Sequence, residues 1–159
     1  MQIRVIAVGK IKEKFLREGI AEYEKRLHPY VKLQVVEISE EKRPASTSPA
    51  TELAAKEKEG ERILATIPEG SYVIALDVKG QSWSSEKLAA SMSERELSGQ
   101  NQLVFVIGGD IGLSPAVLAR SNLRLSLSRM TLTHPMARLL LLEQVYRTFR
   151  ILRGEPYHK

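Results

Sequence analysis

The chain has 159 residues, of which 43% are hydrophobic and 27% charged, and these proportions are typical of a soluble globular protein with one core. The absence of cysteine excludes disulfides, thiolate metal ligands and a cysteine nucleophile, and no apolar run approaches the ~20 residues that cross a bilayer. With a net charge of +5 and an N-terminus that has a strand pattern instead of a signal peptide, we expect a single cytoplasmic domain over residues 1–159.

Strand and helix patterns alternate along the chain. Continuous apolar or β-branched runs predict strands at residues 2–8, 31–38, 72–78, 103–107 and 123–127. Helical spacing and serine or proline start signals predict helices at residues 12–27, 49–68, 84–97, a short stretch after Ser114, and 134–153. Thr133 or His134 is expected to cap the last helix, and Gly154 to end it. The polar segment 39–48 is predicted to be a loop.

Two of these helices show a stripe that should face the core. In the first helix the stripe consists of Leu16, Ile20, Tyr23 and Leu27. In the second helix it consists of Leu53, Gly60, Leu64 and Ile67. Apolar strands alternating with such helices predict an α/β fold, with a mostly parallel sheet covered by helices on both faces.

Ligands bind beyond the carboxyl ends of the strands in such sheets, and three strand ends carry suggestive residues. These are the segments 76–80, 107–112 and 127–132. The glycines of the second segment allow close backbone approach to a ligand, although a simple tight turn explains them equally well. The strand-terminal Asp77 could serve a site or could only cap the following helix. There is no G-x-G-x-x-G fingerprint and no Walker lysine.

Polar groups able to do chemistry also lie at both ends of the last helix. His134 stands at its start, and His158 stands in the terminal Pro-Tyr-His-Lys sequence, whereas His28 precedes Pro29 at a helix end and is expected at the surface. No H-x-x-x-H pattern or acidic cluster supports a metal site, and we expect neither a metal nor a membrane partner.

Charge is distributed unevenly along the chain. Residues 113–159 hold eight Lys and Arg but only two Glu, whereas the preceding residues have one more acidic than basic side chain. This asymmetry indicates a surface that faces RNA or DNA, or else arginines that simply solvate a helix face.

Taken together, these segments resemble one known family along essentially the whole chain. The matching motifs are the Met1-x-Ile-x-Val-Ile-Ala-Val-Gly-Lys start, Ala75-Leu-Asp-x-x-Gly80, Ser84-Ser-Glu, Val106-Ile-Gly-Gly-x-x-Gly-Leu113, Leu127-Ser-x-Met-Thr-Leu132, Leu142-Glu-Gln-x-Tyr-Arg147 and Gly154-Glu-Pro-Tyr-His-Lys159. The chain thus resembles the RlmH family of SPOUT methyltransferases.

The resemblance implies an activity, a topology and an assembly. It implies transfer of a methyl group from S-adenosylmethionine to N3 of pseudouridine 1915 in 23S rRNA, on the assembled ribosome, by a homodimer. It also implies a deep C-terminal trefoil knot within residues 70–159. Selection by the assembled ribosome fits a small chain without an added RNA-binding domain, because basic side chains supply affinity but little specificity.

The family pattern also implies roles for individual residues. The cofactor would be held by the three strand-end loops, through Leu76, Gly108, Gly109, Gly112, Leu127, Ser128, Arg129, Met130, Thr131 and Leu132. Near the reacting base we expect His158 to assist the chemistry and Tyr157 to orient or stack. Arg129, Arg138 and Lys159 are expected to bind RNA.

The sequence leaves open the effect of one departure from the common form, and it allows two other functions. Many relatives read Pro-His-Gln where this chain reads Thr133-His134-Pro135, so His134 could be only a cap and the general base is not fixed. A catalytically silent RNA- or ribosome-binding protein on the same fold is the first alternative. An enzyme for a small nucleotide, using the loop at Gly108, is the second. The sequence also leaves open whether the segment 39–48 closes over the substrate.

Overall fold

The computed structural model describes residues 1–157, and in this range five strands form one parallel sheet in the order β2-β1-β4-β3-β5. The strands are β1 (Gln2–Val8), β2 (Lys32–Ile38), β3 (Tyr72–Ser82), β4 (Gln102–Ile107) and β5 (Leu123–Ser126). The helices are α1 (Lys14–Leu27), α2 (Pro49–Thr66), α3 (Ser85–Leu97), α4 (Pro115–Arg120) and α5 (His134–Leu152). The predicted parallel α/β sheet is therefore confirmed, with element boundaries shifted by a few residues.

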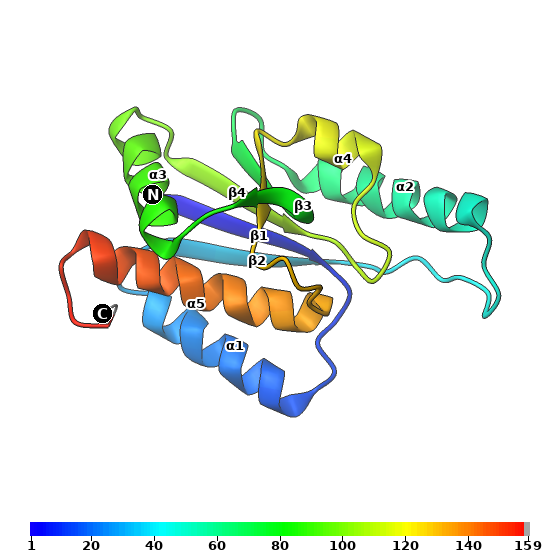
Figure 1. Ribbon diagram of the computed structural model, residues 1–159, viewed down its shortest axis with the longest axis horizontal. Helices are drawn as coiled ribbons and strands as arrows, with labels where there is room; N and C mark the ends of the chain where they lie inside the picture. Colours follow the sequence, from blue (N-terminus) through cyan, green and yellow to red (C-terminus); the bar gives the residue numbers. More distant parts are fainter. Residues whose placement is uncertain (158–159) are drawn as a thin grey trace.

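Helices cover both faces of the sheet, as Figure 1 shows. On one face, α1, α3 and α5 pack against side chains such as Val5, Phe105 and Ile107. On the other face, α2 and α4 pack against Ile6 and Val104 and their neighbours. Successive residues of β1 and β4 point to opposite faces, so a strand buried on both sides needs the continuous apolar runs found in the sequence.

The apolar stripes predicted for α1 and α2 are largely correct. In α1, Leu16, Ile20 and Leu27 are buried and Tyr23 is half-buried. In α2, Gly60 is buried and both Leu64 and Ile67 pack against the core, whereas Leu53 is 43% exposed and lies outside it. Gly60 allows α2 and α4 to approach closely, since a side chain added there would collide with Ser114 at the start of α4.

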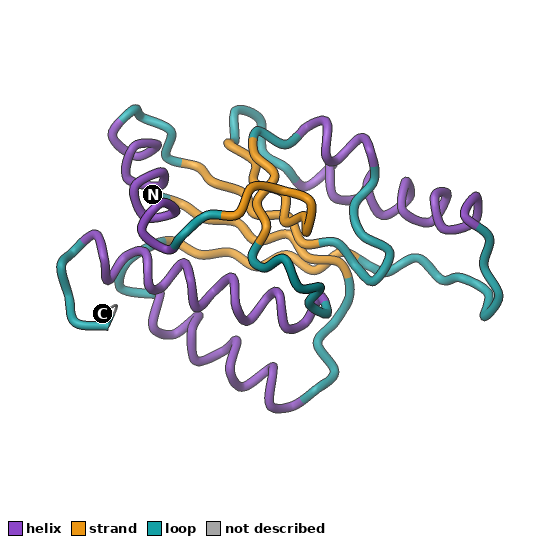
Figure 2. The backbone as a smooth tube through the Cα atoms, viewed as in Figure 1, coloured by secondary structure: helices purple, strands orange, loops and turns teal. Residues whose placement is uncertain are grey.

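Strand β3 is longer than predicted because it pairs with β5 twice. Leu125 of β5 lies opposite Leu76 and again opposite Gln81, so residues 77–80 leave the pairing and then return to it. Gly80 permits this course, since a Cβ there would lie 2.6 Å from the backbone of Arg124. The sharp bend of this strand is visible in the centre of Figure 2. The end of β3 is thereby held against the start of the loop that follows β5.

Candidate active site

The first candidate loop is a closed glycine turn at the carboxyl end of β4. The Gly112 amide donates a hydrogen bond to the Gly109 carbonyl at 3.1 Å, and Gly112 has a φ of +82°. A Cβ at Gly108 would lie 2.8 Å from the Gly112 carbonyl carbon. Glycine is thus required at Gly108 by close backbone approach and favoured at Gly112 by its left-handed conformation.

The second candidate loop follows β5 and is shaped by its own serines. The Ser126 hydroxyl donates to the Ser128 carbonyl at 2.8 Å, and the Ser128 hydroxyl accepts from the Met130 amide at 3.0 Å. These local bonds hold the loop without help from distant elements. Met130 in this loop is 79% exposed.

The third candidate loop is the excursion of β3 over residues 77–80. The Asp77 carboxylate accepts a hydrogen bond from the Lys79 amide at 3.0 Å, which turns the chain at the end of the first pairing with β5. Asp77 therefore shapes this loop and does not cap α3, whose N-cap is Ser84, with the Lys87 amide as donor. The capping alternative for Asp77 is excluded.

The three loops meet around a single cavity of about 140 Å³. Every residue predicted to hold the cofactor lines it except Arg129, which is exposed. The lining is completed by residues that the sequence prediction did not place at the cofactor, namely Asp77, Val78, Ile107, Leu113, His134 and Ala137. No sequence signal marks Ala137, which reaches the cavity because α5 starts at its rim.

His134 faces this cavity and is the first residue of α5. Thr133, not His134, occupies the N-cap position, and its side chain makes no capping hydrogen bond. The His134 Nδ1 atom is buried and has no hydrogen-bond partner among the described residues. Its ring lies against Gly9 at the end of β1, where an added Cβ would be 3.2 Å from Cε1. His134 therefore lines the cavity, and its buried Nδ1 atom is left without a partner among the described residues.

Arg138, predicted to bind RNA, is instead buried inside the protein. Its side chain donates to the Glu37 carboxylate at 2.7 Å and to the Gly9 carbonyl at 3.0 Å, and the residue is only 3% exposed. A guanidinium already paired and shielded in this way is poorly placed to meet an rRNA phosphate. The structure thus gives Arg138 a different role, which is to join α5 to β1 and β2.

A larger hollow of about 980 Å³ opens beside Arg138 at the edge strand β2, away from the glycine turn. Glu24 and Glu37 both line it, and burial raises the pKa of Glu24 above its usual range. These two carboxyl groups stand with Lys32 and the engaged Arg138, and none of the three candidate loops borders this hollow. The smaller cavity is therefore the better candidate, because three loops converge on it.

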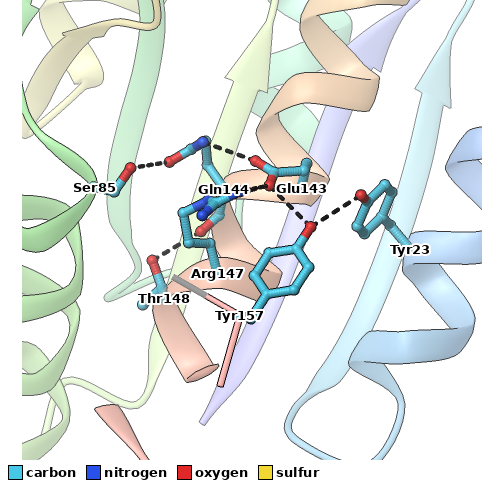
Figure 3. A network of polar contacts seen from close by, with 7 residues as sticks. All are labelled: Tyr23, Ser85, Glu143, Gln144, Arg147, Thr148 and Tyr157. Carbon is cyan, nitrogen blue, oxygen red and sulfur yellow. Dashed lines mark hydrogen bonds and ion pairs between the residues drawn. The ribbon is translucent and has the colours of Figure 1, made fainter. Parts of the chain in front are cut away.

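Tyr157 lies on the side of α5, in the polar network shown in Figure 3, and not in the cavity of its own chain. Its hydroxyl donates to the Glu143 carboxylate at 3.0 Å and lies 3.1 Å from the Tyr23 hydroxyl. Burial and these two partners raise the pKa of Tyr157, so its hydroxyl stays protonated. The Arg147 guanidinium stacks 4.6 Å from the ring centroid. Tyr157 is thus suited to anchor or stack, and not to act as a base.

The remaining chain end is held by Arg150. Its guanidinium contacts Glu155, the Tyr30 hydroxyl at 2.8 Å and the Pro156 carbonyl at 3.0 Å. The tail up to Tyr157 therefore follows a fixed path along α1 and α5. The predicted residues His158 and Lys159 lie outside the described residues.

Residues 1–157 contain neither a metal site nor a membrane-spanning helix. No group of three or more histidine or acidic side chains in this range could hold a metal ion. No helix in the same range has the length and apolar character needed to cross a membrane.

Comparison with known proteins agrees with this arrangement. A family model described as "Predicted SPOUT methyltransferase" matches residues 1–158. A protein of Methanoregula boonei is 62% identical over the full length of both chains. Proteins of Carboxydothermus hydrogenoformans (56% identical) and Listeria monocytogenes (54% identical), each named ribosomal RNA large subunit methyltransferase H, also match over the full length of both chains. The chain therefore belongs to the ribosomal RNA large subunit methyltransferase H family, RlmH, within the SPOUT methyltransferases.

Proposed function

We propose that this protein transfers a methyl group from S-adenosylmethionine to N3 of a pseudouridine in large-subunit rRNA. One observation carries the proposal, which is the convergence of the three strand-end loops on one cavity. The relatives named above add the kind of acceptor, since their names specify the RNA of the large ribosomal subunit.

The cavity residues fit this cofactor. S-adenosylmethionine carries no phosphate, so it needs no phosphate-binding lysine, and the glycines at 108, 109 and 112 present backbone with no side chain to the cavity. Leu76, Met130 and Leu132 offer apolar surfaces to the adenine ring. The cavity is smaller than the ~300 Å³ of a typical small-molecule site, and its exposed wall at Met130 and Thr131 would leave part of the cofactor open to the substrate.

When bound, the cofactor supplies an activated methyl group, and the chain's own residues must position the acceptor and remove its proton. N3 of the base carries a proton that has to leave before or during transfer, which requires a base within hydrogen-bond reach. Among the described residues, the titratable groups that line the cavity are Asp77 and His134. Because Asp77 already accepts from the Lys79 amide, His134 is the freer of the two, and His158 of the tail is the other candidate.

A homodimer would let the tail of one subunit reach the cavity of the other. Within one chain, Tyr157 is bound to Glu143 and Tyr23, apart from the cavity. We therefore propose that each active site is built from two subunits, with Arg129, exposed beside the cavity, and Lys159 contacting the RNA.

We also propose that the C-terminal part of the chain forms a deep trefoil knot. The double pairing of Leu125 with Leu76 and Gln81 supports it, since residues 77–80 must pass around β5. Knots are rare in proteins, and the close approach at Gly80 shows how tightly the two segments are drawn together here.

The direct test is transfer of labelled methyl from S-adenosylmethionine to ribosomes from a strain that lacks this gene. We expect label in the large-subunit rRNA with the wild-type protein and a large loss with His158→Ala. Label retained by that variant but lost with His134→Ala would make His134 the base. Absence of label with a folded wild-type protein would favour the silent RNA-binding alternative, which predicts no cofactor binding.

A further inference from the structure

The segment 39–48 is tied to the outer corner of the glycine turn by one ion pair. The Arg43 guanidinium donates to both carboxylate oxygens of Asp110, each at 2.7 Å. Asp110 stands in the turn that the bond from Gly112 to Gly109 closes. The Arg43 side chain is 16% exposed and the Asp110 side chain is 58% exposed, so this is a partly exposed ion pair.

A buried carboxylate is bonded to the segment 39–48 and lies next to the glycine turn. Glu59 of α2 is 2% exposed, and its Oε2 atom accepts from the Glu41 amide at 2.9 Å. Its Oε1 atom has no partner among the described residues and points toward Gly109, where an added Cβ would lie 3.9 Å away. Burial raises the pKa of Glu59, whereas the Arg43 guanidinium lowers that of Asp110.

The other side of this turn is the wall of the cavity. Gly108, Gly109 and Gly112 line it, while Asp110 points outward to Arg43. Glycine-rich backbone has many accessible conformations, so the shape of such a turn has to be imposed by its neighbours. The neighbours here are Arg43 on the outside and Glu59 beneath.

From this arrangement we infer that Arg43 and Glu59 are positioning residues, which hold the 108–112 turn in the shape that binds the cofactor. The segment 39–48 is thus a strap that sets cofactor affinity without touching the cofactor. This inference rests on the proposed function, because it assumes that the cavity binds S-adenosylmethionine.

The chain supplies a matched control in Arg62. Arg62 holds the same segment to α2, through the Glu41 carboxylate at 2.6 Å and the Ser39 carbonyl at 3.0 Å, but it does not contact the glycine turn. Loss of Arg62 therefore removes a contact between the segment and α2, but it leaves in place the contact between Arg43 and Asp110, through which the strap acts on the turn.

The experiment is calorimetric titration of the full-length protein with S-adenosylmethionine at low ionic strength. We expect Arg43→Ala to raise the dissociation constant about fivefold, the upper range for a single ion pair that is partly exposed. Arg62→Ala should bind like the wild type. The exchanged pair Arg43→Asp with Asp110→Arg should recover most of the affinity that Arg43→Asp alone loses. With saturating cofactor, the methyl-transfer rate of Arg43→Ala should equal that of the wild type.

The outcomes separate the inference from the proposed function. Wild-type affinity in both Arg43→Ala and Asp110→Asn would overturn the inference alone, as would an exchanged pair that binds more weakly than either single variant. Absence of binding by the wild type would overturn the proposed function and this inference with it. Should Arg43→Ala fail to fold, Asp110→Asn carries the same test, because its side chain is more than half exposed.

Discussion

At the scale of single residues, Gly108 is the position where the site tolerates least change. An alanine there would place its Cβ 2.8 Å from the Gly112 backbone and would distort the turn that walls the cavity. We expect Gly108→Ala to weaken S-adenosylmethionine binding at least tenfold, consistent with the ~1–3 kcal/mol that such overpacking costs. Gly70→Ala is the control, since Gly70 has positive φ but no atom within 4 Å of the added Cβ. Equal affinity in both variants, measured by calorimetry, would contradict the expectation.

Asp110 makes a separate prediction about pH. Because its hydrogen bond from Arg43 lowers the pKa of Asp110, the ionised form is favoured in the folded state. Ionised Asp110 stabilises the folded state at pH values above its usual pKa of 3.8. This stabilisation is lost as the pH falls through the lowered pKa of the folded state. The difference in unfolding free energy between wild type and Asp110→Asn should shrink from pH 7 toward acid. Urea unfolding at several pH values measures it, and a constant difference would argue against the linkage.

The sequence allowed some of these residues to be predicted and not others. The glycines of the 108–112 turn and the serines after β5 are local signals, and the structure brings them to one cavity. The burial of Arg138 could not be foreseen, because its partner Glu37 is 101 residues away along the chain. The sequence places His134 at a helix start, but its packing against Gly9, just after β1, joins segments that are far apart along the chain.

At the scale of elements, the tail is fixed by the final helix and by α1. Arg150 contacts three groups there, on Tyr30, Glu155 and Pro156. We expect Arg150→Ala to release the tail and to lower methyl transfer to ribosomes about tenfold, which corresponds to ~1.4 kcal/mol of lost positioning. Cofactor affinity should not change, because the tail does not line the cavity of its own chain.

The control for this variant is Arg26→Ala. Arg26 lies near the same aromatic side chains, 5.1 Å from the Tyr23 ring centroid and 5.7 Å from that of Tyr146, but its hydrogen bond goes to Glu22 of its own helix. It should keep nearly full activity. Equal losses of methyl transfer in both variants would mean that the aromatic side chains around Tyr23 and Tyr146 matter as a whole. The contacts of Arg150 with the tail would then have no separate effect.

Element boundaries were predicted well where caps are local, and poorly where tertiary contacts decide. Ser48, Ser84 and Ser114 each cap a helix as their sequence context indicates. The core face of α2 is predicted correctly at Gly60, Leu64 and Ile67, but not at Leu53, which lies in the first turns of the helix and is exposed. The length of β3 was underestimated because a second pairing with β5 leaves no mark in the periodicity of the strand.

At the scale of the whole molecule, the parallel sheet follows from the alternation of strands and helices, but the strand order does not. The order places β1 between β2 and β4, and β5 at an edge beside β3. Such neighbours are chosen by packing between distant segments, which a single sequence does not display. The last third of the chain carries the excess of positive charge. Which of these side chains meet a substrate depends on how the whole surface is arranged.

That charge gives a prediction for the interaction with ribosomes. If Arg and Lys side chains contact rRNA phosphates, binding should release counterions, and affinity should fall by at least tenfold between about 50 and 200 mM salt. Methyl transfer to protein-free rRNA fragments should be far slower than to assembled ribosomes, because so small a protein has few groups with which to read sequence. Filter binding and labelled methyl transfer measure the two effects. Equal rates on fragments and ribosomes would refute selection by the assembled particle.

The double pairing of Leu125 also has a consequence for the folding of the protein. The cavity exists only when residues 76–78 and 127–132 lie side by side, and that requires β5 to have reached its place against both halves of β3. A chain in which this late, long-range pairing is missing could keep most of its secondary structure and still have no place for a ligand. Ligand binding therefore shows that a chain has completed this strand pairing. By mass action, a bound ligand stabilises only the chains that have completed the pairing.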